Sequence, residues 1–122
     1  MSKAQFLKDN LRPGEIYAGL ILGQNGEQDY HLILLPGEAE RVTWAQAKDF
    51  AKKAGGALPD RRELRLLWGN AKQEFKPEWY WSSEQRASYS DYAWLQHFTD
   101  GNQYDGRKGY ANRARAVRRL AI

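Results

Sequence analysis

Residues 43–64 read TWAQAKDFAKKAGGALPDRREL and contain two helix starts of the same design. The Thr43 side chain can accept a hydrogen bond from the backbone amide of Gln46 while the Gln46 side chain reaches back, which forms a capping box. Asp60 and Glu63 repeat this arrangement further along the chain. The stretch therefore predicts two short helices in succession.

The bodies and ends of both helices carry supporting signals. Gly55-Gly56 ends the first helix, because glycine adopts the left-handed cap conformation without steric cost, and Gly69-Asn70 follows the second. Apolar residues at helical spacing predict the buried face of each helix. They are Trp44, Ala47, Phe50, Ala51 and Ala54 in the first helix, and Leu64, Leu67 and Trp68 in the second.

Strand-like segments lie on both sides of the helices. Residues 16–22 and 30–35 flank Asn25-Gly26, a dipeptide that favours the positive φ angles of a tight turn, so an antiparallel hairpin is predicted over about 16–35. After the helices, three further segments alternate as strands do: 79–83, 92–98 and 113–120. We expect residues 1–12 to be weakly helical at most, a turn at Asp100-Gly101 and a loop over 106–112. This segregated order predicts an α+β fold with a mainly antiparallel sheet.

Composition limits the class of protein. The chain has 122 residues, of which 42% are hydrophobic and 28% charged, so we expect one folded domain over 1–122 rather than a disordered or fibrous chain. It contains no cysteine, which excludes disulfides and thiolate metal sites. No apolar run is long enough for a membrane span or an export leader, which predicts no membrane insertion and a place in the host cytoplasm or the virion.

The net charge of +4 is concentrated at the C-terminal end, where every charged residue is basic: Arg107, Lys108, Arg113, Arg115, Arg118 and Arg119. Our preferred interpretation is a solvated strand face on which arginine alternates with apolar residues. The alternative is a phosphate-binding surface, with nucleic acid as the less favoured partner.

The sequence shows no constellation of catalytic or metal-binding residues. His31 and His97 both lie in predicted strands, where structural roles are the simpler interpretation, and no phosphate loop or nucleophile motif is present. The acids around Asp100 lack the bidentate acid that ends a calcium loop. We predict no enzyme activity, no cofactor and no metal.

Aromatic residues after the helices are divided between core and surface. Alternation places Trp79 and Trp81 on one strand face and Tyr80 on the other. Residues 84–112 are rich in tyrosine and small polar residues, which recognition loops favour. The predicted ligand-binding residues are Arg86, Tyr89, Asp91, Tyr92, Asn102, Tyr104, Arg107 and Tyr110. The alternative is plain loops packed by their own aromatic rings.

An ordered set of short motifs resembles the collagen-like adhesin C-terminal (Lcl C-terminal) domain family, a domain of unknown function common in bacteria and phages. The motifs are Thr43-Trp44-Ala45-Gln46-Ala47, Gly55-Gly56-Ala57-Leu58-Pro59, Arg62-Glu63-Leu64, Tyr80-Trp81-Ser82-Ser83, Ala93-Trp94, Phe98, Asp100-Gly101 and Arg115-Ala116-Val117-Arg118. The resemblance covers about residues 42–119. It places Trp81 and Trp94 on the central sheet and so implies that both are core residues. It implies a C-type-lectin-like fold with two helices on a twisted, mainly antiparallel sheet, chain ends close together and a long irregular loop region.

The resemblance also implies a function. Members of the wider fold include adhesins and phage receptor-binding proteins, so it implies a non-catalytic, phage- or prophage-encoded module that binds a protein or glycan through loops 84–112. The calcium-dependent sugar-binding signatures of the fold are absent from this chain, so that mode of binding is not carried over. Two alternatives remain open: an accessory protein that inhibits a host defence or nucleic-acid-handling protein, and a virion subunit that forms homo-oligomers.

Overall fold

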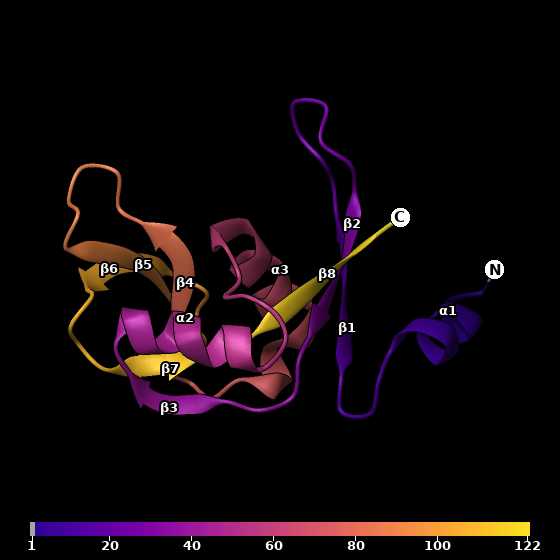
Figure 1. The fold of residues 1–122 in the computed structure, drawn as a ribbon, viewed down its shortest axis with the longest axis horizontal. Helices are drawn as coiled ribbons and strands as arrows, with labels where there is room; N and C mark the ends of the chain where they lie inside the picture. The colour runs from indigo at the N-terminus through magenta and orange to yellow at the C-terminus, as the bar shows by residue number, and fades with distance from the viewer. Residues whose placement is uncertain (1) are drawn as a thin grey trace.

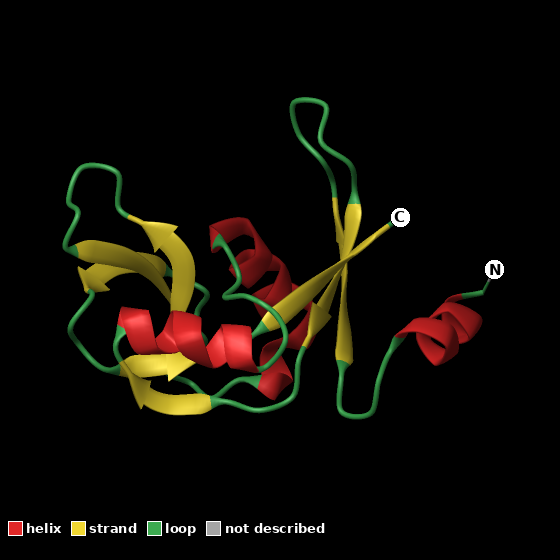
Figure 2. Ribbon diagram, in the orientation of Figure 1, coloured by secondary structure: helices red, strands yellow, loops and turns green. Residues whose placement is uncertain are grey.

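The computed structural model describes residues 2–122 and arranges the strands in two sheets (Figures 1 and 2). The helices are α1 (Lys3–Asn10), α2 (Trp44–Lys53) and α3 (Arg61–Ala71), and a 3-10 turn, η1 (Lys72–Glu74), follows α3. The strands are β1 (Ile16–Ile21), β2 (Tyr30–Leu34), β3 (Ala39–Val42), β4 (Trp79–Gln85), β5 (Tyr92–His97), β6 (Gln103–Arg107), β7 (Asn112–Ala114) and β8 (Val117–Ala121). The first sheet has the order β1-β2-β8 and the second β3-β7-β4-β5-β6. The predicted α+β class is confirmed.

The elements with local signals form as predicted. Strands β1 and β2 pair as an antiparallel hairpin, and Asn25 and Gly26 in its turn have φ angles of 56° and 86°. Both capping boxes are present, from Thr43 to Gln46 and from Asp60 to Glu63. Among the described residues, no helix is both long and apolar enough to cross a bilayer.

Two predictions about elements are wrong. Helix α1 forms because Ser2 caps it and Phe6 packs on the rings of Tyr17 and His31. The expected strand over 113–120 is broken into β7 and β8, which belong to different sheets. The chain crosses between the sheets at Arg115, which is buried and donates from its guanidinium to the carbonyls of Leu35 and Glu74. Alternation alone does not reveal such a crossing.

The second sheet also differs from the predicted one. Strands β3 and β6 were not predicted, and β4 pairs in parallel with β7, so this sheet is mixed. Residues 84–112 are not one long irregular loop, because β5 and β6 take up much of that stretch. The elements stack in the order α1, first sheet, α3, second sheet and α2.

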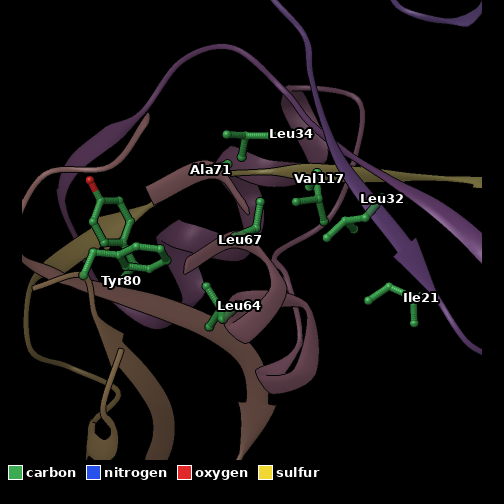
Figure 3. Close-up of a cluster of buried hydrophobic side chains, with 10 residues drawn as sticks. Ile21, Leu32, Leu34, Leu64, Leu67, Ala71, Tyr80 and Val117 are labelled. Atoms are coloured by element: carbon green, nitrogen blue, oxygen red, sulfur yellow. The ribbon is translucent and has the colours of Figure 1, made fainter. Parts of the chain in front are cut away.

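Two hydrophobic clusters fill the space between these layers. Leucines of α3 and β2 pack with Tyr80 between the two sheets (Figure 3), and alanines of α2 pack with Trp81 on the other face of the second sheet. Tyr80 and Trp81 therefore lie on opposite faces of β4, as alternation predicts.

The C-terminal arginines are structural. Arg113 pairs with Glu38 at 2.6 Å, Arg118 with Glu15 at 2.8 Å and Arg119 with Glu63 at 2.6 Å. They alternate with apolar residues as predicted, but the face is not simply solvated, because each guanidinium meets a carboxylate from a distant part of the chain. These pairs account for much of the charge that suggested a phosphate-binding tail.

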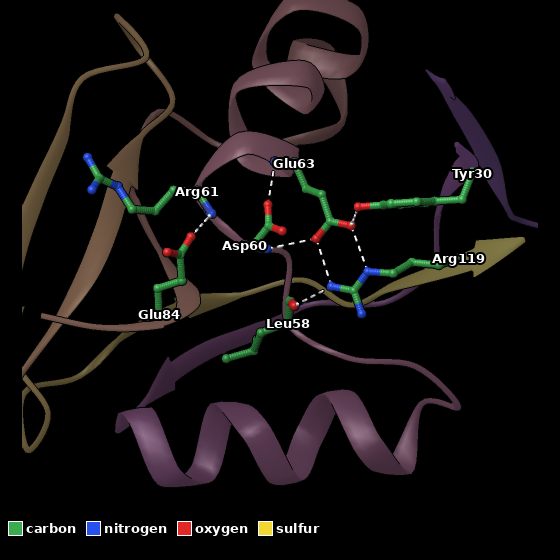
Figure 4. Close-up of polar contacts among 7 residues, drawn as sticks. All are labelled: Tyr30, Leu58, Asp60, Arg61, Glu63, Glu84 and Arg119. Carbon is green, nitrogen blue, oxygen red and sulfur yellow. Dashed lines mark hydrogen bonds and ion pairs between the residues drawn. The ribbon is translucent and has the colours of Figure 1, made fainter. Parts of the chain in front are cut away.

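The carboxylate of Glu63 is the centre of a polar network at the start of α3 (Figure 4). It is fully buried and accepts from the Arg119 guanidinium through both oxygens, from the Tyr30 hydroxyl at 2.6 Å and from the Asp60 amide at 2.8 Å. Burial by itself would raise the pKa of Glu63, but the bonds from Arg119, Tyr30 and Asp60 outweigh it and lower the pKa. Burial, with the bond to Glu63 next, raises the pKa of Tyr30 to about 12.

Replacing Glu63 tests this network. Glu63→Gln keeps the volume but removes the charge opposite Arg119, and we expect the free energy of unfolding at pH 7 to fall by about 2 kcal/mol. Because the folded pKa of Glu63 lies below its usual 4.5, its contribution is complete above that pH and is lost as the pH falls through the folded value. Urea unfolding between pH 7 and pH 3 should therefore show the gap between wild type and variant closing at acid pH.

The exposed Glu27→Gln provides the matched control and should leave stability unchanged. Burial raises the pKa of Asp60, which has the opposite effect on stability, but Asp60 is present in all three proteins. A gap between wild type and Glu63→Gln that stays constant down to pH 3 would show that the Glu63 charge does not stabilise the fold.

Candidate functional site

Alternate residues of β5 and β6 point to the side of the second sheet on which α3 lies. Tyr92 of β5 is paired with Arg107 of β6, and Trp94 of β5 with Asp105 of β6. In the next pair on this same side of the sheet, Gln96 is fully buried, and its side-chain amide donates to the Leu64 carbonyl of α3 at 2.6 Å. Helix α3 thus covers Gln96 and begins at Arg61, which leaves Tyr92 and Trp94 outside the core.

Arginines cover the aromatic rings of this region. The Arg61 Cζ lies 3.7 Å from the centre of the Trp94 ring. Arg86, which follows β4, forms an ion pair with Asp105 at 2.6 Å, and its Cζ lies 5.1 Å from the ring of Tyr89 and 5.4 Å from that of Trp94. These distances are typical of cation–π contacts.

Tyr92 continues the same surface. The Tyr89 and Tyr92 rings meet edge to face with their centres 6.0 Å apart, and the Arg107 Cζ lies 5.3 Å from the Tyr92 ring. We call this surface the aromatic–arginine face. It consists of Arg61, Arg86, Tyr89, Tyr92, Trp94, Asp105 and Arg107.

The prediction that Trp94 is a core residue is wrong. Its side chain is only partly buried and lies beneath Arg61 and Arg86 on the aromatic–arginine face. Trp94 faces the side of the sheet on which α3 lies, but α3 does not extend far enough along the strand to cover it. Trp81, by contrast, is fully buried, which confirms its expected core role.

Two glutamines hold the arginines of α3 in place. Gln103 donates from its side-chain amide to the Arg61 carbonyl and to the Gln96 side chain, both at 2.8 Å. Its Oε1 accepts from Arg61 Nε at 2.9 Å and from Arg65 at 3.2 Å. Neither glutamine was singled out in the sequence. The one signal that could have indicated them is that each is a polar residue at a strand position where alternation favours burial.

The predicted binding residues do not all lie together. Arg86, Tyr89, Tyr92 and Arg107 belong to the aromatic–arginine face. Tyr104 lies on the opposite side of β6, where its ring meets that of Trp79 with centres 5.7 Å apart. Asn102 is used in a turn, where its amide and side chain both donate to Asp100.

The remaining two predicted residues, Asp91 and Tyr110, lie at one end of the face. With Arg107, Lys108 and Gly109 they line a surface hollow of about 360 Å³. The Lys108 amide donates to the Asp91 carbonyl at 2.9 Å and fixes this end of the sheet. Arg107 links the hollow to the aromatic–arginine face.

Most side chains of the face belong to types that are common at protein interfaces. They offer guanidinium groups, tyrosine hydroxyls and aromatic surface, which together contribute much of the binding energy at protein interfaces. The histidines are elsewhere: His31 contacts the Tyr17 hydroxyl, and His97 contacts Thr99. Within residues 2–122, no group of three or more His, Asp or Glu side chains is arranged to hold a metal ion.

Comparison of the chain with models of protein families gave no match, and comparison with curated proteins gave no significant match. What the face binds therefore has to be inferred from its own geometry and chemistry.

Gln103 allows the support of the face to be tested. Gln103→Leu leaves the buried Gln96 oxygen without its donor and removes the acceptor of Arg61 and Arg65. We expect the free energy of unfolding to fall by about 1–2 kcal/mol, the cost of an unpaired buried polar group. Chemical denaturation measures this loss. The same change at the exposed strand residue Gln85, Gln85→Leu, should cost less than about 0.5 kcal/mol, and equal losses in the two variants would contradict the role given to Gln103.

Proposed function

We propose that this chain is a non-catalytic recognition module that binds a protein ligand through the aromatic–arginine face. The observation that carries the proposal is the set of arginines that lie over Trp94, Tyr89 and Tyr92, of which Arg61 and Arg86 are held in place by hydrogen bonds and an ion pair. Tyrosine, tryptophan and arginine are the residue types most enriched at the energetic centres of protein interfaces.

The face is ordered before any ligand binds. Trp94, Tyr92, Asp105 and Arg107 lie on paired strands, and Arg61 is fixed by Gln103. Side chains that are already held in place lose less conformational entropy on binding, so more of the contact energy contributes to affinity. Tyr89, which is 54% exposed, is the ring most available to a partner.

The arrangement of the rings favours a protein over a glycan. The Arg61 guanidinium occupies the ring face of Trp94 at 3.7 Å, so a sugar could stack there only by displacing it. Tyr89 and Tyr92 meet edge to face and do not form one flat platform. Protein side chains can insert between such groups and form hydrogen bonds with the arginines and tyrosine hydroxyls.

The proposal includes a C-type-lectin-like architecture. It is supported by the two capped helices and by strand β8, which returns from the C-terminal part of the chain to pair with the N-terminal hairpin (Figure 1). The proposed binding surface then lies on the sheet remote from this pairing of the chain ends.

Two tyrosines provide a matched test of the proposal. Tyr89 and Tyr104 are 54% and 58% exposed and lie on opposite sides of the β5–β6 pair. The wild-type chain, Tyr89→Ala and Tyr104→Ala are immobilised and exposed to a lysate of the cells that produce the chain. We expect a protein that wild type and Tyr104→Ala retain and that Tyr89→Ala retains at least about tenfold less, as for the loss of an interface anchor.

The contrary outcomes are specific. A ligand lost from Tyr104→Ala but kept by Tyr89→Ala would move the site to the other side of the sheet. Binding of the wild-type chain to a glycan array, abolished by Tyr89→Ala, would replace the protein ligand with a carbohydrate. Because both tyrosines are exposed, unfolding temperatures should stay close to that of wild type in both variants.

A further inference from the structure

A second surface hollow lies between the β1–β2 hairpin and α3, away from the rings of the aromatic–arginine face. We call it the hairpin groove; its volume is about 630 Å³ and its lining is Leu20, Ile21, Leu22, Gly23, Gln24, Arg62, Arg65 and Leu66. Strand β1 packs against α3 along one side, where the Asn70 side chain donates to the Ala18 carbonyl at 2.7 Å. This contact holds the two elements that border the groove together.

The groove exposes large apolar side chains. Leu20 is 42% and Leu22 61% exposed, and the partly buried Leu66 lies beside them on α3. Single exposed leucines are common on protein surfaces, but clustered leucines along a groove are typical of interaction sites. Burial of this apolar surface by a partner would stabilise the complex.

The groove also contains two arginines that form no ion pair with the described residues, although the adjoining hollow that they share holds the acids Glu27, Asp60 and Glu84. Arg62 donates to the Leu22 carbonyl at 2.8 Å, and Arg65 donates to the Gln103 side chain at 3.2 Å, so both bind neutral oxygens. Within residues 2–122, four arginines form ion pairs with carboxylates, and Arg62 and Arg65 are not among them. No Asp or Glu lines the groove.

The position of Arg62 on the helix makes its positive charge less favourable. It lies in the first turn of α3, where the positive end of the helix dipole disfavours a cation. Each guanidinium has five N–H donors, and few of them are used by the neutral acceptors. A carboxylate in the groove would form charge-assisted bonds with both arginines and would also interact favourably with the helix end.

We propose that the hairpin groove docks a protein partner through an acidic segment that also carries large apolar side chains. The apolar side chains cover Leu20, Leu22 and Leu66, and the carboxylates meet Arg62 and Arg65. This inference does not rest on the function proposed for the aromatic–arginine face, because the leucines belong to a separate surface.

Two other occupants fit less well. A second copy of this chain bound symmetrically would place a second groove of the same kind, with two arginines and no acid, against this one. A nucleic acid strand would meet leucines where it needs stacking surface. A short acidic segment avoids both conflicts.

The probe for this proposal is a phage-displayed library of random 16-residue peptides, selected on the immobilised full chain. The enriched peptides are then synthesised with a fluorescent label, and their affinities are measured by anisotropy. We expect an excess of Asp and Glu together with several Leu, Ile, Phe or Trp residues in the enriched sequences. Replacing their acids with lysine should weaken binding at least about tenfold, the effect of losing one charge-assisted contact.

Variants of the chain locate the binding. Leu22→Ser and Arg65→Glu should each weaken the selected peptides at least about tenfold. The matched controls are Ile122→Ser and Arg41→Glu, exposed residues outside the groove, which should bind within about twofold of wild type. Tyr89→Ala should also bind normally, so failure here and failure of the proposed function can be told apart. Amide NMR shifts should be concentrated in residues 20–24 and 62–66.

Several results would overturn the inference. They are a library that enriches nothing, enriched peptides without an acidic excess, and peptides that bind Leu22→Ser and Arg65→Glu as well as they bind wild type. A dT12 oligonucleotide that binds the chain and is displaced by the peptides would make the groove a nucleic-acid site. A dimer in light scattering that dissociates in Leu22→Ser would assign the groove to a second copy of the chain. Circular dichroism of each variant establishes that it is folded.

Discussion

The carboxylate of Glu63 has no contact with solvent and is held by groups from three separate parts of the chain. Tyr30 comes from β2, Arg119 from β8 and the Asp60 amide from the residue that caps α3. A buried charge is tolerated only when its bonding capacity is filled, so these groups must be close together for α3 to pack. One carboxylate thus fixes the start of α3 against the first sheet, and the surfaces described above depend on where that helix starts.

The position of α3 determines what the second sheet exposes. The helix covers Gln96, whose amide reaches the Leu64 carbonyl, and Gln103 extends this contact to Arg61 and Arg65. At the next residue pair on the same side of the strands, α3 no longer covers the sheet. Trp94 is therefore covered by arginine side chains instead of by the core.

Features that depend on residues close together in the sequence could be predicted, and features that depend on residues far apart in the sequence could not. The helix caps and the Asn25-Gly26 turn are local signals, and the elements they predict were found where expected. Strands β3 and β6 lack such signals, and the break at Arg115 depends on carbonyls far away in the sequence. For the same reason, four of the predicted binding residues came together on one face, while Tyr104 and Asn102 did not. Glu63 was recognised as a cap, but its partner Arg119, which lies 56 positions along the chain, was not.

Charge in this chain indicates interaction surfaces only after its pairing is known. The basic C-terminal stretch attracts attention in the sequence, yet Arg113, Arg118 and Arg119 are all paired with carboxylates in the fold. Within the part of the chain that the structure describes, the arginines of α3 have no carboxylate partner. They lie in a segment where acidic and basic residues are mixed, so the local composition does not indicate that their charge is unpaired. Arg61 and Arg65 are one helical turn apart and share the Gln103 oxygen. Arg65 also lines the hairpin groove, so its charge acts at both surfaces. Tyr89 and Leu22, by contrast, each belong to only one surface.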